Sequence, residues 1–319
     1  FSLFSVVLGS SRTRIGIATQ MKDVEGRTAF VTGGSSGIGL GIARAFLAAG
    51  MRAAISYRRR EHRESALESL RSDDHAQPCA VFMDATDRAS VRAAASEVER
   101  RFGNLHVLCN SAGVNLLGPM DEATYDDWDW VLGVNLGGII NSLVEFLPMI
   151  KKHGQGGHII NVASMGSFIT GPRFGVYATS KFAVRGLTES LRFVLGRHKI
   201  GVSLLCPGLT KSNIYEAPLH RPSNLSRSGV PIDETSIRQL AAVHDLGMDA
   251  DEVGRKALQG ILRNDFYIFS HPEFREEVRE ICDQILRALP AEESGSERMI
   301  YERRRREATE EARALFDDV

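Results

Sequence analysis

Short apolar runs alternate with longer amphipathic stretches along most of the chain. The apolar runs predict seven strands, at Thr28–Thr32, Arg52–Tyr57, Cys79–Met83, Leu105–Asn110, His158–Ala163, Gly201–Cys206 and Phe266–Ser270. Helices are predicted between them, near residues 38–49, 61–71, 87–102, 124–150, 175–197 and 251–263. Because the strands are apolar throughout rather than alternating, we expect helices on both faces of the sheet. The pattern therefore predicts an α/β fold with a doubly wound, parallel, seven-stranded sheet.

The same pattern indicates a single domain. No repeat or low-complexity linker interrupts residues 21–270, which hold all of the predicted strands. Residues 1–20 are interpreted as a leader, or as sequence upstream of the folded protein. Their apolar start, Phe1–Leu8, is too short to span a membrane and lacks the basic region of a signal peptide. Residues 212–250 are irregular, with several Pro and Ser, as is typical of a lid over a binding site.

Residues 271–319 are predicted to form a helical C-terminal extension. An apolar stripe at helical spacing runs through Phe274, Val278, Ile281, Ile285 and Leu289. Pro290 can end this helix, and a break at residues 294–296 separates it from a second, Arg- and Glu-rich helix from residue 299 onward. Two interpretations stay open for this extension, a subunit clasp or pocket cover and a solvated surface helix.

Composition and charge narrow the classes of partner. The 319 residues carry 39 Lys plus Arg and 40 Asp plus Glu, a net charge of −1, which supplies no field for gripping nucleic acid. No stretch after residue 20 is judged to reach the ~18 uncharged apolar residues of a spanning helix. The four cysteines lie far apart, which favours free thiols in a cytoplasmic protein, and the histidines show no metal-ligand spacing. We expect no nucleic-acid partner, no membrane span and no metal.

A glycine-rich turn follows the first predicted strand. Residues 32–39 read Thr-Gly-Gly-Ser-Ser-Gly-Ile-Gly, so Gly33, Gly37 and Gly39 lie where a helix is predicted to begin. Such glycines let the backbone turn tightly and approach a pyrophosphate at the helix N-terminus. The turn predicts a dinucleotide site, although glycines in this place can also serve packing alone.

A second group of residues indicates proton transfer. Tyr177 and Lys181 lie four apart in one predicted helix, so the ammonium can lie near the phenol and favour its ionised form. Ser164 follows the fifth predicted strand, where it can converge with Tyr177 on one substrate oxygen. Asn135 is a polar residue within a largely apolar helical stretch.

In their order and separations these motifs resemble the classical short-chain dehydrogenase/reductase family, from about Val24 to Ser270. The resemblance implies a Rossmann-like fold, a nicotinamide cofactor and catalytic positions for Asn135, Ser164, Tyr177 and Lys181. In the family Lys181 would also reach the nicotinamide ribose, and Asn135 would anchor a water relay to Lys181.

The resemblance also implies cofactor contacts after later strands. Asp84 matches the acidic residue near the adenine. Residues 110–113 match the family's Asn-Asn-Ala-Gly with Ser111 in place of the second Asn, and residues 207–212 match its Pro-Gly turn with Thr210 where an aliphatic residue is common. The complete predicted cofactor set is Gly33, Ser35, Ser36, Gly37, Ile38, Gly39, Tyr57, Arg58, Asp84, Ala85, Asn110, Ala112, Gly113, Tyr177, Lys181, Pro207, Gly208, Thr210 and Ser212.

The end of the second predicted strand bears on the choice of cofactor. A carboxylate there would bind the 2′-hydroxyl of NAD and repel a 2′-phosphate. This chain instead has Tyr57 followed by Arg58, Arg59 and Arg60, so we expect NADP, with Arg58 on the 2′-phosphate. NAD stays an alternative, since the three arginines could also form a solvated turn.

The resemblance implies an oxidoreductase that acts on a CH–OH group, with Tyr177 exchanging the proton and Ser164 holding the substrate oxygen. The lid composition favours a medium or bulky apolar secondary alcohol or ketone. Candidate substrate contacts, each of which could equally cover the sheet edge, are Asn115, Leu117, Phe168 and Tyr215.

Other functions stay open at this point. They are an NAD-linked dehydrogenase of aryl or steroid-like carbinols, a 3-oxoacyl reductase and, in another class, a nucleotide-sensing interaction protein without turnover. The intact set of Ser164, Tyr177 and Lys181 argues against the last of these. The family also implies a homodimer or homotetramer joined through the helices near 124–150 and 175–197.

Overall fold

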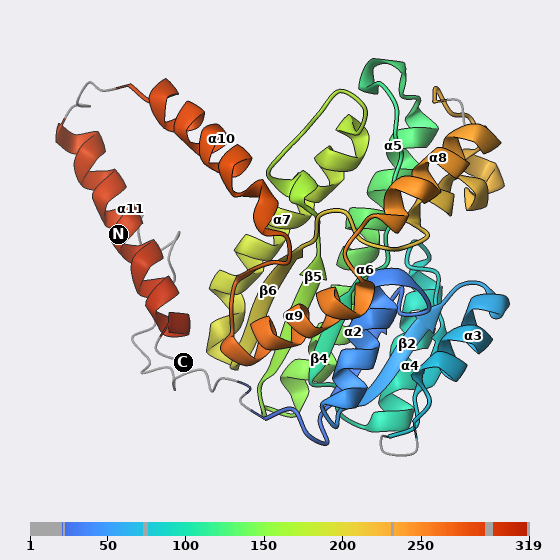
Figure 1. Ribbon diagram of the computed structural model, residues 1–319. Coiled ribbons are helices and arrows are strands. Elements are labelled where there is room, and N and C mark those ends of the chain that lie inside the picture. The colour runs from blue at the N-terminus through green and yellow to red at the C-terminus, as the bar shows by residue number, and fades with distance from the viewer. Residues whose placement is uncertain (1–20, 22, 73–75, 231–232, 291–295, 318–319) are drawn as a thin grey trace.

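The computed structural model describes residues 21, 23–72, 76–230, 233–290 and 296–317 (Figure 1). Within these residues seven parallel strands form one sheet in the order β3-β2-β1-β4-β5-β6-β7. The strands are β1 (Thr28–Thr32), β2 (Arg52–Tyr57), β3 (Cys79–Phe82), β4 (Val107–Asn110), β5 (Gly157–Val162), β6 (Ile200–Cys206) and β7 (Tyr267–Phe269). The chain reverses its direction across the sheet between β1 and β4, which confirms the predicted doubly wound, Rossmann-like fold. The leader predicted at residues 1–20 lies outside the described residues.

Helices cover both faces of the sheet (Figure 1). One face carries α2 (Gly37–Ala48), α3 (Arg60–Leu70) and α9 (Ala250–Arg263), whose apolar stripes build one core. The other face carries α4 (Arg88–Phe102), α6 (Gly138–Lys152) and α7 (Gly175–Leu195), which build a second core. The inner strands are therefore buried on both sides, which explains their unbroken apolar runs, whereas the edge strands β3 and β7 expose Phe82 and Phe269.

The stretch predicted as one helix at 124–150 is divided in the structure. It consists of α5 (Tyr125–Leu132), a π-helical turn at Gly133–Gly137, and α6. The turn contains Asn135, whose side chain bonds both backbone groups of Val114 in the loop after β4. The prediction of a single regular helix was wrong because this tertiary contact is made at the widened turn.

The same stretch corrects the prediction about membrane spans. Residues 125–152 reach the length and hydropathy of a membrane-crossing helix, with a mean hydropathy of 1.5 over the most apolar window. Half of that window is buried inside the fold, as in a core helix.

The segment predicted to be irregular, residues 212–250, contains a helix. Short 3₁₀ turns at Ile214–His220 and Ser223–Leu225 precede α8 (Glu234–Asp245), which Asp233 caps through the Ser236 amide. Ile237, Leu240 and Ala241 lie at helical spacing in it, although the helix buries none of its residues completely. A wholly irregular lid was therefore a wrong prediction.

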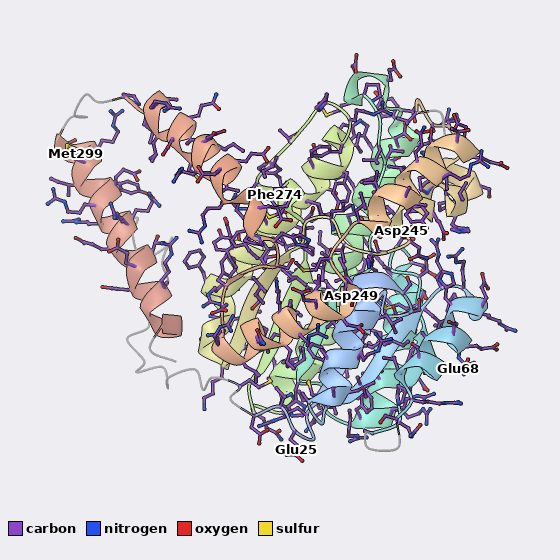
Figure 2. All side chains as sticks on the ribbon, in the orientation of Figure 1. Glu25, Glu68, Asp245, Asp249, Phe274 and Met299 are labelled. Carbon is purple, nitrogen blue, oxygen red and sulfur yellow. The ribbon has the colours of Figure 1, made fainter. Side chains whose placement is uncertain are left out.

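The C-terminal extension forms the two predicted helices, α10 (Arg275–Ala288) and α11 (Ser296–Asp317). Phe274, Val278 and Ile281 pack against the second core, whereas Ile285 and Leu289 are exposed. Figure 2 shows Phe274 where α10 leaves the body of the protein and Met299 near the start of α11. Most of the break predicted at 294–296 lies outside the described residues.

Candidate functional site

A cleft lies at the carboxyl ends of the strands, where the chain reverses its direction across the sheet. Parallel α/β sheets bind ligands at such a point. Most of the predicted cofactor residues line this cleft, namely Gly33, Ser35, Ser36, Gly37, Ile38, Gly39, Tyr57, Arg58, Asp84, Ala85, Ala112, Gly113, Tyr177, Lys181 and Ser212.

The turn between β1 and α2 is held against the loop after β4. Thr32 Oγ1 accepts hydrogen bonds from the amides of Ser111 at 3.0 Å and Ala112 at 3.1 Å. Gly33 has φ +63°, and a Cβ there would lie 2.7 Å from Ala112 Cα, so only glycine fits. The N-cap residue of α2, Ser36, makes no side-chain capping bond, so the first amides of this helix face the cleft without that partner. The turn thus forms a cradle that fits a pyrophosphate.

Tyr177 and Ser164 meet beside the cleft. The two side chains lie close together, since a Cβ at Gly166 would lie 3.4 Å from both Ser164 Oγ and Tyr177 Cε1. Ser164 Oγ accepts from the Gly166 amide at 3.0 Å, which fixes the hydroxyl at the end of β5. Burial raises the pKa of Tyr177, and the nearby Ser164 hydroxyl opposes the rise.

Lys181 lies one helical turn further along α7. Its Nζ is 5.5 Å from the centre of the Tyr177 ring and donates to the Val162 carbonyl at 3.1 Å. Burial lowers the pKa of Lys181 to about 8, and the neighbouring Cys206 weakly opposes this. The prediction that the ammonium, together with the nicotinamide ring, favours an ionised phenol stays a prediction.

Asn135 holds the catalytic helix to the loop after β4. Its Oδ1 accepts from the Val114 amide at 2.8 Å, and its Nδ2 donates to the Val114 carbonyl at 3.0 Å and to Ser180 Oγ at 2.9 Å. Ser180 directly precedes Lys181, so Asn135 is connected to the lysine through the backbone of α7. Both donor hydrogens of its amide group are used by these contacts, while Oδ1 keeps a second acceptor site.

Four predicted cofactor residues do not line the cleft. Asn110 is buried and donates to Asn161 Oδ1 at 2.8 Å, while its own Oδ1 has no partner. The amide of Gly208 donates to His271 Nδ1 at 2.9 Å. Together with Pro207 and Thr210, these residues shape the loops that border the site.

The predicted substrate residues also lie outside the lining of this cleft. The Phe168 ring packs beneath the Arg185 guanidinium at 4.2 Å and beside Phe269 at 5.4 Å, toward β7. The Tyr215 ring lies 5.4 Å from that of His244 within the lid. Asn115 is buried and Leu117 is half-buried in the loop after β4.

The structure adds residues that the sequence reasoning missed. At the end of the cleft next to β2, it brings together Arg59, His62, Glu216 and His220 with Arg58. The run of three arginines after the second predicted strand already indicated that Arg59 could lie at the cofactor site. Nothing in the sequence indicated that the lid residues Glu216 and His220 reach the same place, about 160 residues further along.

Comparisons with known proteins agree with this geometry. A family model described as short chain dehydrogenase matches residues 27–220. The chain is 38% identical over 281 residues to the C alpha-dehydrogenase of Sphingobium sp. strain SYK-6, covering 87% of this chain and 91% of that protein. A putative short-chain dehydrogenase from Novosphingobium aromaticivorans superposes with a TM-score of 0.79 at 38% identity, covering 92% of this chain and 99% of the other.

A further solved structure was determined with a bound nucleotide. A short-chain dehydrogenase/reductase from Burkholderia phymatum in complex with NAD superposes with a TM-score of 0.77 at 30% identity. The superposition covers 86% of this chain and 99% of that one.

Proposed function

The chain belongs to the short-chain dehydrogenase/reductase family, whose enzymes act on CH–OH groups with NAD(P), and we propose that it prefers NADP and a bulky apolar secondary alcohol or ketone. The observation that carries the proposal is the meeting of Ser164 and Tyr177 beside a cleft whose far end holds Arg58 and Arg59. The cleft therefore pairs a proton-transfer group with a cationic end suited to a phosphate.

The residues of the cleft fit the cofactor. The turn at Gly33–Gly39 would hold the pyrophosphate, Asp84 and Ala85 would lie by the adenine, and Lys181 would reach the nicotinamide ribose. When bound, the cofactor supplies or accepts the hydride.

The protein's own part in the reaction is the proton. The Tyr177 hydroxyl would donate its proton to a carbonyl oxygen in reduction and take it back in oxidation, and burial raises its pKa. Ser164 would hold the same oxygen through its hydroxyl. Lys181, with a pKa near 8, could help to re-protonate the phenol at neutral pH.

The preference for NADP rests on the end of β2. Tyr57 stands where NAD-specific sites carry a carboxylate, and Arg58 and Arg59 line the same end of the cleft, where their guanidinium groups could bind a 2′-phosphate. A solved relative bound to NAD keeps NAD as the alternative. The test is the ratio of kcat/KM for NADPH and NADH in the wild type and in Arg58→Ala. Equal values in the wild type that Arg58→Ala leaves unchanged would exclude the preference.

The apolar character of the substrate rests on two observations. Val114, Val134, Ile214 and Ala217 add apolar walls to the cleft. Relatives include, at 33% identity over 191 residues, a 3beta-hydroxysteroid dehydrogenase from Eggerthella lenta, which favours steroid-like carbinols among the alternatives. Loss of NADPH absorbance at 340 nm across a panel of aryl, steroid and 3-oxoacyl ketones separates these substrates. If no carbonyl compound is turned over, the alternative of a nucleotide-sensing interaction protein is favoured.

We also propose that the protein is a homo-oligomer joined through α6 and α7. The outer faces of these helices expose large apolar side chains, namely Ile140, Val144, Phe182, Phe193 and Val194. A surface of this kind is typical of an interface. Molar mass in solution tests this proposal, and a monomer would contradict it.

A further inference from the structure

We propose that the lid supplies His220 to the 2′-phosphate end of the cofactor cleft, so that recognition of the phosphorylated ribose draws the lid closed. The inference rests on the proposed preference for NADP and deepens it. It names His220, a residue outside the segment that follows β2, as a contributor to the specificity for NADP.

Two arginines in the segment after β2 hold the lid at this end of the cleft. Arg58 Nη2 donates to the His220 carbonyl at 3.2 Å, and Arg59 Nη1 donates to His220 Nε2. The other nitrogen of the same guanidinium, Arg59 Nη2, donates to His62 Nε2 at 2.7 Å. One guanidinium thus bridges an imidazole from α3 and an imidazole from the lid, and all of these residues line the cleft.

The chemistry of this cluster suits an anion. A guanidinium can only donate, so the imidazole nitrogens that face Arg59 accept, and both histidines are neutral in this arrangement. Burial and the charge of Arg59 lower the pKa of both His62 and His220, while Glu216 opposes the effect on each. Arg58 also lowers the pKa of His220, and Glu61 raises that of His62.

A phosphate placed among these groups would change their roles. It would accept hydrogen bonds from the guanidinium groups, and each imidazole could then turn an N–H toward it. The negative charge would favour the protonated form of both imidazoles, which makes their bonds to the phosphate stronger.

The position of His220 in the lid explains why it would control closure. Directly after it, Arg221 is fixed by an ion pair with the buried Asp127 at the start of α5. Gly229 packs so closely there that a Cβ would lie 1.6 Å from the Glu122 carbonyl oxygen. Residues 221–229 are therefore anchored on α5.

The part of the lid before His220 forms the roof of the cleft. Ser212, Asn213, Ile214, Glu216 and Ala217 all line it. His220 thus lies between an anchored segment and the lining segment 212–217, so a contact at this residue would orient that segment over the cleft.

The experiment uses the full chain and two adenosine ligands that lack nicotinamide, adenosine 2′,5′-bisphosphate and adenosine 5′-monophosphate. Calorimetry gives their dissociation constants without any turnover. His220→Ala should weaken binding of the bisphosphate about tenfold, the effect of losing a charge-assisted hydrogen bond, and change that of the monophosphate less than about twofold. His220→Gln should recover part of the loss. The exposed neighbour Leu219, replaced by Ala, is the matched control and should change neither affinity.

Hydrogen exchange of residues 212–220 gives the second readout. The bisphosphate should slow exchange there in the wild type, whereas the monophosphate should not, and His220→Ala should abolish the difference. If Arg58→Ala loses the discrimination between the two ligands but His220→Ala keeps it, the inference is overturned and the preference for NADP stands. If the wild type binds both ligands equally, the proposed preference fails, and the inference fails with it.

Discussion

The ion pair between Asp127 and Arg221 should be the strongest anchor of the lid. Both side chains are buried, with 0% of Asp127 and 6% of Arg221 exposed. Asp127 Oδ1 accepts from Arg221 and from Ser228 Oγ at 2.8 Å. Its Oδ2 accepts from the amides of Thr124 at 2.8 Å and Gly229 at 3.0 Å, and from Thr124 Oγ1 at 2.9 Å. Every acceptor position of the carboxylate is occupied by a donor.

Asp127→Asn is the sharpest perturbation of this anchor. The variant keeps the shape of the side chain, but its NH₂ must face donors in whichever position it takes, and Arg221 keeps an unpaired buried charge. Breaking a buried pair in this way costs about 3–5 kcal/mol.

The titration of Asp127 gives a second measure of the same anchor. Burial alone would raise the pKa of Asp127, but hydrogen bonds from Arg221, Thr124 and Gly229 outweigh it and lower the pKa to about 2. Relative to the ordinary aspartate value this corresponds to about 2.5 kcal/mol. Because the folded-state pKa lies below the unfolded one, this stabilisation is present above about pH 4 and is lost as the pH falls toward 2.

Urea unfolding at pH 7, with hydrogen exchange of residues 221–229, measures the loss. The matched control is Asp126→Asn, because the partner of Asp126 is Arg227, whose side chain is 83% exposed, and an exposed guanidinium is solvated when it loses its partner. We expect about 1 kcal/mol or less for this control. The double variant Asp127→Asn with Arg221→Met should be more stable than Asp127→Asn alone, since it removes the unpaired charge. A loss below 1 kcal/mol for Asp127→Asn, or no recovery in the double variant, would refute the reasoning.

Three further predictions follow from the site and the tail. Arg58→Ala should lower kcat/KM for NADPH about 10- to 100-fold and leave that for NADH within about threefold, measured at 340 nm; equal losses for both cofactors would contradict the assignment. The ammonium of Lys181 should titrate near pH 8 in the cofactor-free protein, because burial lowers its pKa, and NMR of labelled lysine would show it; a value above 10 would contradict the burial argument. If α11 clasps a second subunit, removing residues 291–319 should lower the molar mass in solution, and an unchanged oligomer would argue against the clasp.

The sheet could be predicted from the sequence because a strand buried on both faces leaves an unbroken apolar run. The glycine turn and the pair of Tyr177 and Lys181 were also visible, since their geometry depends on spacing within one turn or one helix. The π-helical turn at Asn135 could not be predicted, because its partner Val114 belongs to another element.

The lid shows most clearly where sequence reasoning ends. The meeting of His220 with Arg58 and Arg59 joins segments about 160 residues apart. Phe168 was predicted to face the substrate on its position after β5, but its ring packs on Arg185 and the rings of β7. Contacts of this kind are decided by the packing of distant elements.

The central claim is that Tyr177 exchanges a proton with a substrate oxygen held by Ser164. The most direct test is reduction of a ketone panel by NADPH, followed at 340 nm, for the wild type and Tyr177→Phe, which removes only the hydroxyl. We predict turnover of at least one bulky apolar ketone by the wild type and a loss of at least about 100-fold in kcat for the variant, with its binding of NADPH unchanged. A Tyr177→Phe enzyme that keeps the wild-type kcat would contradict the claim.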